Sequence, residues 1–379
     1  MISKQDKRFM RRAISLAYRA MGYTAPNPAV GAVVVKNGTV VGEGWHKKAG
    51  TPHAEVNALA QAGEMASGAD IYVTLEPCNH HGRTPPCTRA VLEAGIRRVV
   101  IGVLDPNPKV AGGGAAFLKQ HGLQVDSGCL EAECQLLLAP FAKAVTRAVP
   151  WIRQKTASSL DGRTATYKGH SKWITNERAR GFGQRLREMS DAILIGRRTA
   201  EADDPSLTFR KRGHNPPYKK RLWRVVLDSR LSLDPGLKIF QVSEQAPTIA
   251  VCTDSAPSER IRRLADQGVQ VIQTEQAPGG RVRIDQALGQ LCSQGIHSVL
   301  VEGGAEIHGA FHDADLVDEG FHFFAPMIIG GSGARPAVAG RGAAELSQAH
   351  RLQNARIRHF GDNFLVTGTY TDPAELWKG

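Results

Sequence analysis

The residues that most constrain the fold of this chain lie between positions 53 and 87. His53 and Glu55 flank one alanine, Cys78 follows the dipeptide Glu76-Pro77, and Cys87 comes after eight intervening residues. One imidazole and two thiolates can hold a zinc ion, and a site with three protein ligands keeps a fourth position open for water. The fold must therefore bring His53 and both cysteines to one point.

Glu55 lies two residues from the histidine and is not needed as a ligand. Zinc lowers the pKa of its bound water toward neutrality, and a carboxylate beside that water can carry a proton to a leaving amine. His-x-Glu followed by Pro-Cys is typical of zinc-dependent deaminases of nucleobases and related pyrimidines. The alternative is a structural zinc loop, in which His80 or His81 is the fourth ligand and Glu55 a surface residue.

The spacing of the two cysteines differs from the Cys-x-x-Cys of deaminases that act on nucleosides and nucleic acids. The intervening loop carries His80, His81 and Arg83, which suit a phosphorylated substrate. Residues 74–87 and 105–108 resemble the bifunctional deaminase–reductases of riboflavin biosynthesis, and this likeness covers nearly the whole chain.

The resemblance implies an α/β protein of two domains. A cytidine-deaminase-like three-layer α/β/α domain is expected over residues 1–147, and a dihydrofolate-reductase-like α/β domain over residues 148–379. The first implied reaction is the zinc-dependent hydrolytic deamination of 2,5-diamino-6-(5-phosphoribosylamino)pyrimidin-4(3H)-one. The second is the NADPH-dependent reduction of the ribosyl group of 5-amino-6-(5-phosphoribosylamino)uracil to ribityl.

Length and cysteine content agree with two domains in a reducing compartment. The chain has 379 residues, which suits two domains better than one. Its six cysteines are too few for a disulfide scaffold, so those outside the zinc pattern are expected to be free thiols: Cys129, Cys134, Cys252 and Cys292. No apolar run reaches the length of a membrane span, and the N-terminus lacks the apolar core of a secretory signal. We therefore expect a cytoplasmic protein with no membrane partner.

The net charge of +12 raises the question of nucleic acid. The basic residues are spread along the chain, the densest run (210–221) has the composition of an exposed loop, and aromatic residues make up only 6%. Single-strand binders need an aromatic stacking platform, which is missing here. We expect a small phosphorylated pyrimidine as the partner and no nucleic acid, and the resemblance implies a homo-oligomer, either a dimer or a tetramer.

Two other functions stay open at this point. A deaminase acting on tRNA or a nucleoside would share the zinc pattern, and an RNA substrate would be bound in a salt-sensitive manner. A zinc-stabilised binding protein would hold a nucleotide in its second half without turnover.

Strand and helix patterns alternate in both halves, which is typical of a mixed or parallel sheet covered by helices. The Asn-Gly pair at 37–38 predicts a tight hairpin turn. The first half is expected to contain helices at 4–22, 53–62, 87–94, 114–121 and 130–145, and strands at 29–35, 39–45, 70–75 and 97–103. The second half is expected to contain a helix at 176–189 and strands at 151–157, 192–195, 223–227, 248–252, 269–273, 298–302, 321–329 and 364–370.

The second half contains no Gly-x-Gly-x-x-Gly after a strand, which disfavours a Rossmann site. Instead the strand at 298–302 runs into Gly303-Gly304, and a helix opens near Glu306. Two glycines let backbone amides approach a phosphate, and the helix N-terminus adds aligned N–H donors. An ordinary tight turn is the alternative.

The resemblance carries site residues over to this second half, on segments 159–163, 171–175, 195–199 and 202–208. The implied NADPH contacts are Ala157, Trp173, Thr199, Asp203, Ser229, Gly303, Gly304, Ala305, Glu306, Ile307 and His308. The implied substrate contacts are Ser171, Arg187, Leu207, Arg210 and Glu302. Arginine suits a ribose phosphate because a guanidinium can grip it at two points.

Further candidates come from both halves. For the deaminase substrate the resemblance implies Asn27, for which a simple turn is the alternative. His46, after the second strand, and His80, beside Cys78, are the other candidates. For proton handling in the reduction we expect Lys155 and Glu302, although Lys155 could equally form an ion pair at a strand end. The hydride chemistry itself belongs to the cofactor.

Overall fold

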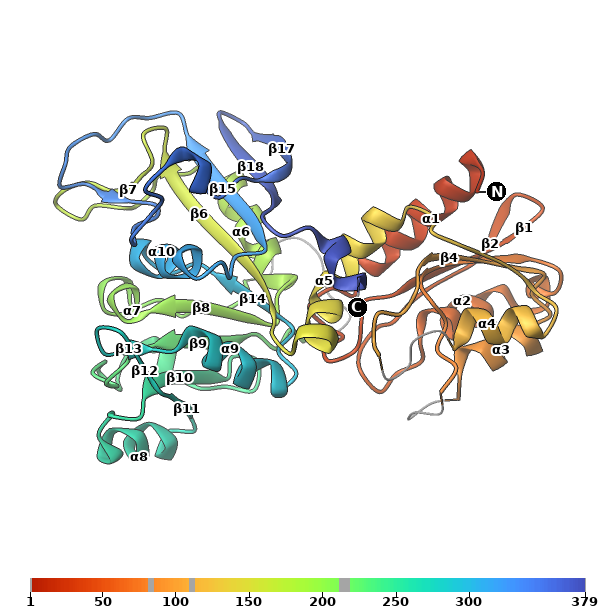
Figure 1. Ribbon diagram of the computed structural model, residues 1–379, viewed down its shortest axis with the longest axis horizontal. Coiled ribbons are helices and arrows are strands. Elements are labelled where there is room, and N and C mark those ends of the chain that lie inside the picture. The colour runs from red at the N-terminus through yellow and green to blue at the C-terminus, as the bar shows by residue number, and fades with distance from the viewer. Residues whose placement is uncertain (1, 81–84, 109–112, 211–218, 379) are drawn as a thin grey trace. The chain divides into compact units, whose positions relative to one another are not determined.

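The computed structural model describes residues 2–80, 85–108, 113–210 and 219–378 and divides the chain into two compact units (Figure 1). The first unit comprises Met1–Ala148 and the terminal segment Pro373–Gly379, and the second comprises Val149–Asp372. Among the described residues, no helix combines the length and the apolar character needed to cross a membrane.

The first unit is a five-stranded sheet between two layers of helix. Its strand order is β2-β1-β3-β4-β5, with β1 antiparallel to both neighbours and β3, β4 and β5 parallel. Helices α1 and α5 cover one face, and α2, α3 and α4 lie on the other (Figure 1). The strands are β1 (Gly31–Lys36), β2 (Thr39–Trp45), β3 (Asp70–Leu75), β4 (Arg98–Val103) and β5 (Gln124–Ser127). The helices are α1 (Lys4–Ala17), α2 (Ala54–Ala62), α3 (Cys87–Glu93), α4 (Gly114–Gln120) and α5 (Glu131–Arg147), with 3-10 turns η1 (Gly63–Ala66) and η4 (Pro373–Trp377).

Glycines on β1 and β2 let helices lie directly on this sheet. A Cβ at Gly31 would come within 2.1 Å of the Ala13 carbonyl oxygen on α1, and one at Gly44 within 2.2 Å of the Ala54 oxygen on α2. The predicted hairpin turn is confirmed, since Asn37 and Gly38 have φ values of 50° and 76°.

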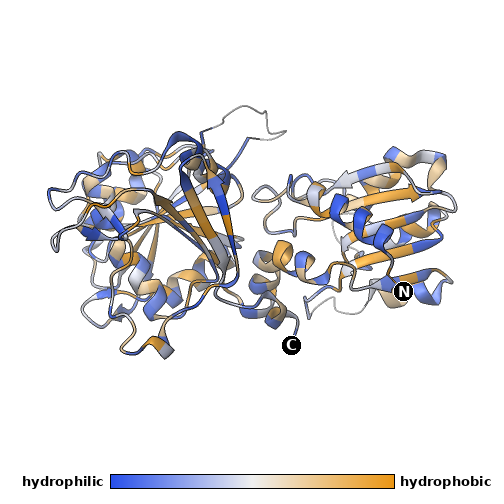
Figure 2. Ribbon diagram, turned by 90° about the horizontal axis from the view of Figure 1, so that it is seen from above, coloured by the Kyte–Doolittle hydropathy of each residue, from blue (hydrophilic) through white to orange (hydrophobic). Residues whose placement is uncertain are grey.

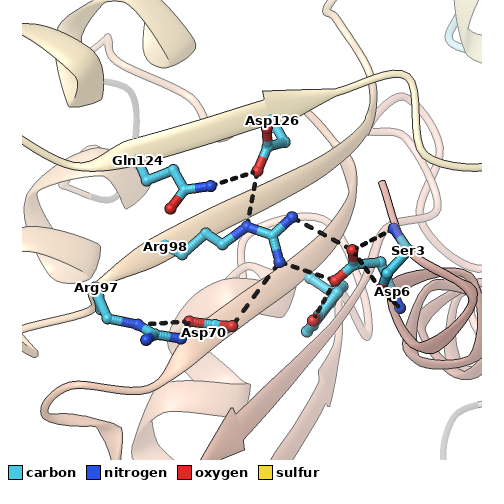
Figure 3. Close-up of polar contacts among 8 residues, drawn as sticks. Ser3, Asp6, Asp70, Arg97, Arg98, Gln124 and Asp126 are labelled. Carbon is cyan, nitrogen blue, oxygen red and sulfur yellow. Dashed lines mark hydrogen bonds and ion pairs between the residues drawn. The ribbon is translucent and has the colours of Figure 1, made fainter. Parts of the chain in front are cut away.

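A cluster of charged residues fixes α1 to the edge of the sheet (Figure 3). Asp6, at the start of α1, is 2.9 Å from Arg98 Nη1 on β4, and Arg98 Nε donates to Asp126 on β5 at 2.7 Å. Burial alone would raise the pKa of Asp6, but hydrogen bonds from Arg98, Ser3 and Tyr72 hold it well below its usual range. The carboxylate is therefore charged in the folded protein and stabilises it.

The second unit is built on a nine-stranded sheet with strand order β11-β10-β9-β8-β14-β6-β15-β18-β17. The strands from β11 to β15 in that order are parallel, and β18 and β17 are antiparallel. The strands are β6 (Trp151–Ser159), β8 (Ala192–Gly196), β9 (Trp223–Leu227), β10 (Thr248–Thr253), β11 (Gln270–Thr274), β14 (Ser298–Val301), β15 (Glu319–Ala325), β17 (Gln353–Phe360) and β18 (Asn363–Thr369). The smaller strands are β7 (Arg163–Ala165), β12 (Gln276–Ala277), β13 (Arg281–Val282) and β16 (Arg335–Pro336).

Helices pack on both faces of this sheet, and the apolar residues gather on the strands (Figure 2). One apolar core holds Leu291 of α9 and Phe311 of α10, a second holds Leu264 of α8, and a third holds Leu186 of α6. The helices are α6 (Glu177–Glu188), α7 (Arg197–Asp203), α8 (Ser258–Asp266), α9 (Ile284–Ser293) and α10 (Ala305–Asp313), with 3-10 turns η2 (Lys238–Phe240) and η3 (Leu346–Gln348).

Two predicted elements were too long, and several were missed. The helix predicted over 4–22 ends at Ala17, where Ala20 N donates to the Ala17 carbonyl in a tighter turn. The strand predicted over 321–329 ends at Ala325, because Pro326 has no N–H to donate. The missed elements include β5, α7 and β17; the first seven residues of β17 are exposed, so this strand has no buried apolar face.

Candidate zinc centre and reductase site

The three predicted metal ligands meet in the first unit. His53 precedes α2, Cys78 follows β3, and Cys87 is the first residue of α3. His53 Nδ1 lies 3.2 Å from Cys87 Sγ and 3.5 Å from Cys78 Sγ, and the three ligand atoms all lie within 4.8 Å of one another. Tetrahedral zinc, with bonds of about 2.0 Å to nitrogen and about 2.3 Å to sulfur, places such atoms roughly 3.5 Å apart. The donor set and its spacing therefore fit zinc.

Glu76 was missed as a functional residue, although a carboxylate in front of Pro77 and Cys78 could have suggested it. Its carboxylate is buried and accepts from the backbone N–H of Asp105 at 3.0 Å and of Ala115 at 2.7 Å. It thereby ties the start of the loop after β4 and the start of α4 to the strand end that delivers Cys78. Groups behind a metal site orient its ligands in this way.

Glu55 lies in the first turn of α2 with only 3% of its surface exposed. Burial raises the pKa of Glu55 to about 7, and the nearby charge of Cys78 acts in the same direction. A carboxyl group with a pKa near the working pH is suited both to accept and to give up a proton. The alternative of a structural zinc loop predicts Glu55 on the surface, and this prediction is wrong.

His46 and Asn27 are brought together beside the ligands. Asn27 Nδ2 lies 3.0 Å from His46 Nε2, and His46 Nδ1 lies 3.2 Å from the Pro52 carbonyl oxygen. Because a carbonyl only accepts, Nδ1 carries the proton and Nε2 accepts from the Asn27 amide. Burial lowers the pKa of His46, which keeps the ring neutral.

The loop after Cys78 is described only in part. His80 is exposed, whereas His81 and Arg83 lie outside the described residues, so their predicted contacts stay predictions. The same holds for most of the basic run 210–221, of which residues 211–218 lie outside the described residues.

In the second unit a buried group of charges joins three elements. Arg187 of α6 donates from Nε and Nη2 to the two carboxylate oxygens of Glu302, at 2.8 and 2.9 Å. Burial lowers the pKa of Lys155 on β6, opposed by the charge of Glu302 and helped by that of Arg187. Burial would raise the pKa of Glu302, but Arg187 and Lys155 bring it to about 2. Glu302 is thus a carboxylate at neutral pH.

The Gly303-Gly304 pair forms a close junction between β14 and α10. A Cβ at Gly303 would lie 2.5 Å from Ile195 Cα, so the packing there requires glycine. Gly304 N donates to Thr199 Oγ1 of α7 at 3.0 Å, which brings two predicted NADPH contacts together. The backbone amides at this turn fit a phosphate of the cofactor.

The other predicted contacts of the second unit differ in exposure. Trp173 is 69% exposed and lies against Arg180, whereas the Leu207 side chain is buried in an apolar core, so any substrate contact falls to its main chain. The side chain of His308 is buried, and its Nδ1 has no hydrogen-bond partner within the described part of the chain. Asp203 and Arg210 are exposed, and Ala157, Ser171 and Ser229 are half-buried.

Comparison with known proteins matches each half of the chain to a family model. Residues 3–103 match the cytidine and deoxycytidylate deaminase zinc-binding region, and residues 150–366 match the RibD C-terminal domain. The riboflavin biosynthesis protein RibD of Bacillus amyloliquefaciens is 41% identical over 97% of both chains. The RibD protein of Escherichia coli strain K12 is 41% identical, over 94% of this chain and 97% of its own.

Solved structures show the same relationship. Acinetobacter baumannii RibD has a TM-score of 0.81 and 38% identity, over 96% of this chain and 98% of its own. A diaminohydroxyphosphoribosylaminopyrimidine deaminase/5-amino-6-(5-phosphoribosylamino)uracil reductase from Thermotoga maritima has a TM-score of 0.82 and 35% identity, with the same coverage.

Fold and site together define a zinc-dependent deaminase joined to an NADPH-dependent reductase. The predicted fold class, a cytidine-deaminase-like α/β part followed by an α/β reductase part, is confirmed. The chain belongs to the RibD family of bifunctional riboflavin-biosynthesis enzymes. Its membership excludes the zinc-stabilised binding protein and the tRNA deaminase, and it confirms zinc and NADPH as cofactors.

Proposed function

We propose that the first unit deaminates 2,5-diamino-6-(5-phosphoribosylamino)pyrimidin-4(3H)-one and that the second reduces the ribosyl group of the resulting uracil derivative to ribityl. The observation that carries the proposal is the meeting of His53, Cys78 and Cys87 beside a buried carboxyl group, Glu55. The two activities of the Thermotoga maritima relative, whose fold this chain shares over 96% of its length, support the choice of substrate.

In the first unit, His53, Cys78 and Cys87 would hold the zinc ion, which when bound supplies a water of lowered pKa. Glu55 takes a proton from that water and passes it to the departing amino group; its pKa of about 7 suits both steps. The ring carbon exchanges its amino group for oxygen, and ammonia leaves.

Asn27 and His46 orient the pyrimidine. Because Asn27 Nδ2 donates to His46 Nε2, its Oδ1 is the amide atom presented to a ring N–H. His80, exposed at the start of the loop, is the residue we propose to meet the ribose phosphate.

In the second unit, Thr199 and residues 303–308 would hold NADPH, which supplies the hydride. Ala157, Trp173, Asp203 and Ser229 complete the proposed cofactor contacts. Lys155 holds at Nζ the proton that accompanies reduction, since Glu302 is already ionised at neutral pH.

The proposed substrate contacts of the second unit come from four residues. Arg187, Arg210 and Ser171 bind the phosphorylated chain, with the main chain of Leu207 beside them. Guanidinium groups suit the phosphate.

We further propose a cytoplasmic homo-oligomer. None of the six cysteines forms a disulfide, which suits a reducing compartment. Oligomerisation rests on the family resemblance and is tested by light scattering after size exclusion, in which a monomer mass would contradict it.

The direct test uses the purified, zinc-loaded chain and the diaminopyrimidine ribosyl phosphate. Ammonia release without NADPH, followed by NADPH consumption once it is added, is the expected result. Ammonia release without later NADPH consumption would remove the reductase assignment, and no ammonia at all would remove the deaminase assignment.

A further inference from the structure

Arg224, on β9 of the second unit, is a buried arginine whose hydrogen bonds to the described residues go to backbone carbonyls. It is 2% exposed, and its guanidinium donates to the oxygens of Ser206 at 3.2 Å, Lys238 at 3.0 Å and Gln241 at 2.8 Å. Burial lowers the pKa of Arg224 to about 10, and no carboxylate is among the causes that would offset it. Burying a charge in this way lowers the stability of the fold. We therefore expect the hydrogen bonds of Arg224 to hold a neighbouring segment in place.

The segment that Arg224 holds is 204–210, which follows α7 and carries two of the proposed substrate contacts. Asp204 and Leu207 have φ values of +37° and +47°, a region that costs energy for any residue but glycine. The segment contains no helix or strand. Its conformation must therefore be imposed by neighbouring elements.

Hydrogen bonds hold the segment at every second residue. The Asp204 carboxylate accepts from Lys238 N at 2.8 Å, and the Ser206 carbonyl accepts from Arg224. The Thr208 carbonyl accepts from Arg187 Nη1 at 3.2 Å, and Arg210 N donates to Gln184 Oε1 at 2.9 Å.

These bonds link the segment to two different parts of the unit. Arg187 and Gln184 belong to α6, beside Glu302, whereas Arg224 and Lys238 belong to β9 and η2. The side of the segment remote from Glu302 is thus fixed by Arg224 and by the pair of Asp204 with Lys238.

We propose that Arg224 and Asp204 are positioning residues for the reductase substrate: they hold segment 204–210 so that the Leu207 main chain and Arg210 meet the ribose phosphate. Neither touches the substrate. The inference rests on the proposed function, because Leu207 and Arg210 are substrate contacts only within it.

A lysine at 224 keeps the charge but cannot reproduce a planar fork that reaches three carbonyls. Arg224→Lys should therefore raise the KM for the pyrimidine in the reduction about tenfold, with kcat within about threefold of the parent. Asp204→Asn, at a partly exposed site, should raise the same KM by about threefold. The NADPH dissociation constant and ammonia release should be unchanged in both variants.

The matched control is Thr274→Val on β11. The buried Thr274 hydroxyl donates to the Glu275 carbonyl at 2.9 Å, so this change removes a hydrogen bond from the same unit without touching η2 or segment 204–210. Its KM for the pyrimidine should equal that of the parent. Hydrogen exchange adds a readout free of activity: amides of 204–210 should exchange faster in both test variants and not in the control.

Unchanged KM and unchanged exchange in Arg224→Lys would overturn the proposal while the parent's reductase activity stands. If Arg224→Lys fails to fold, Asp204→Asn tests the proposal in its place. A KM and a hydrogen-exchange rate equal to those of the parent in Asp204→Asn would then overturn the proposal. A parent chain that consumes no NADPH would remove the proposed function instead, which the wild-type assay shows separately.

Discussion

Arg187 and Glu302 form a two-point ion pair across 115 positions of sequence, with Arg187 Nε and Nη2 at 2.8 and 2.9 Å from the two carboxylate oxygens. The same guanidinium donates to the Thr208 carbonyl. One side chain thus connects α6, the end of β14 and the segment that carries Leu207. Because the pair keeps Glu302 ionised, we propose that Lys155 holds the proton used in the reduction. The negative charge of Glu302 then supports the protonated form of Lys155.

Replacing Glu302 by glutamine should impair reduction and move its pH dependence. The carboxylate raises the pKa of Lys155, so its loss lowers that pKa further. Protonated Lys155 is needed, so activity is present below this pKa and lost above it. In Glu302→Gln the alkaline loss should therefore begin at a lower pH, and kcat/KM at neutral pH should fall about 100-fold.

The measurement is a pH series of NADPH consumption for the parent and for Glu302→Gln. Glu201→Gln, which breaks the exposed pair of Arg197 with Glu201, serves as the control and should match the parent. An alkaline limb that stays in place, or moves upward, would contradict the role given to Glu302.

Replacing Glu55 by glutamine should abolish deamination and spare the second unit. The amide cannot take up a proton, so ammonia release should fall roughly 1,000-fold. Zinc content, measured by atomic absorption, and reduction of supplied aminouracil substrate should both equal those of the parent. Undiminished ammonia release would remove Glu55 from the mechanism.

Removal of zinc should affect the first activity only. Cys87→Ala leaves two ligands, so it should lose bound zinc and ammonia release together, while NADPH consumption with the aminouracil substrate continues. Cys129→Ala is the matched control. Burial raises the pKa of the Cys129 thiol to about 11, and Cys129 does not belong to the ligand cluster. Retained zinc in Cys87→Ala would show that the ligand set is wrong.

The ion pair of Asp6 with Arg98 should contribute to stability in a pH-dependent way. Asp6→Asn should lower the free energy of unfolding of the first unit by about 2 kcal/mol at pH 7, since Arg98 loses one carboxylate partner and keeps Asp126. The folded pKa of Asp6 lies below the unfolded value of about 3.9. The stabilisation is therefore present above that value and is lost as the pH falls through the folded pKa.

Urea titrations of both proteins across the pH range measure this difference. Arg89→Gln, which breaks an exposed pair with Glu93, should change the free energy of unfolding by less than about 0.5 kcal/mol. A gap between parent and Asp6→Asn that persists unchanged at low pH would contradict the assignment.

Local patterns in the sequence were enough to predict much of the fold. The hairpin at Asn37-Gly38 and the positions of the buried parallel strands depend on residues close together in the chain, and the zinc ligands are marked by their residue types and short motifs. Short-range chemistry fixes such features, so the sequence displays them.

Other features depend on partners far apart in sequence. The terminal turn η4 returns to the first unit, where Trp377 Nε1 donates to the Leu104 carbonyl at 2.9 Å, and no pattern near either residue predicts this. Arg224 is one basic residue before an apolar strand, and its three carbonyl partners become visible only in the fold. The anchoring role of Glu76 likewise depends on backbone amides of two later segments.

The most direct test of the account is an isotope experiment on the zinc-loaded chain with the diaminopyrimidine ribosyl phosphate. The reaction is run in ¹⁸O-labelled water with NADPH deuterated at the transferred position, and the product is weighed by mass spectrometry. One ¹⁸O in place of the amino group and one deuterium in the ribityl chain are predicted. A product lacking ¹⁸O would contradict hydrolytic deamination, and one lacking deuterium would contradict hydride transfer from NADPH.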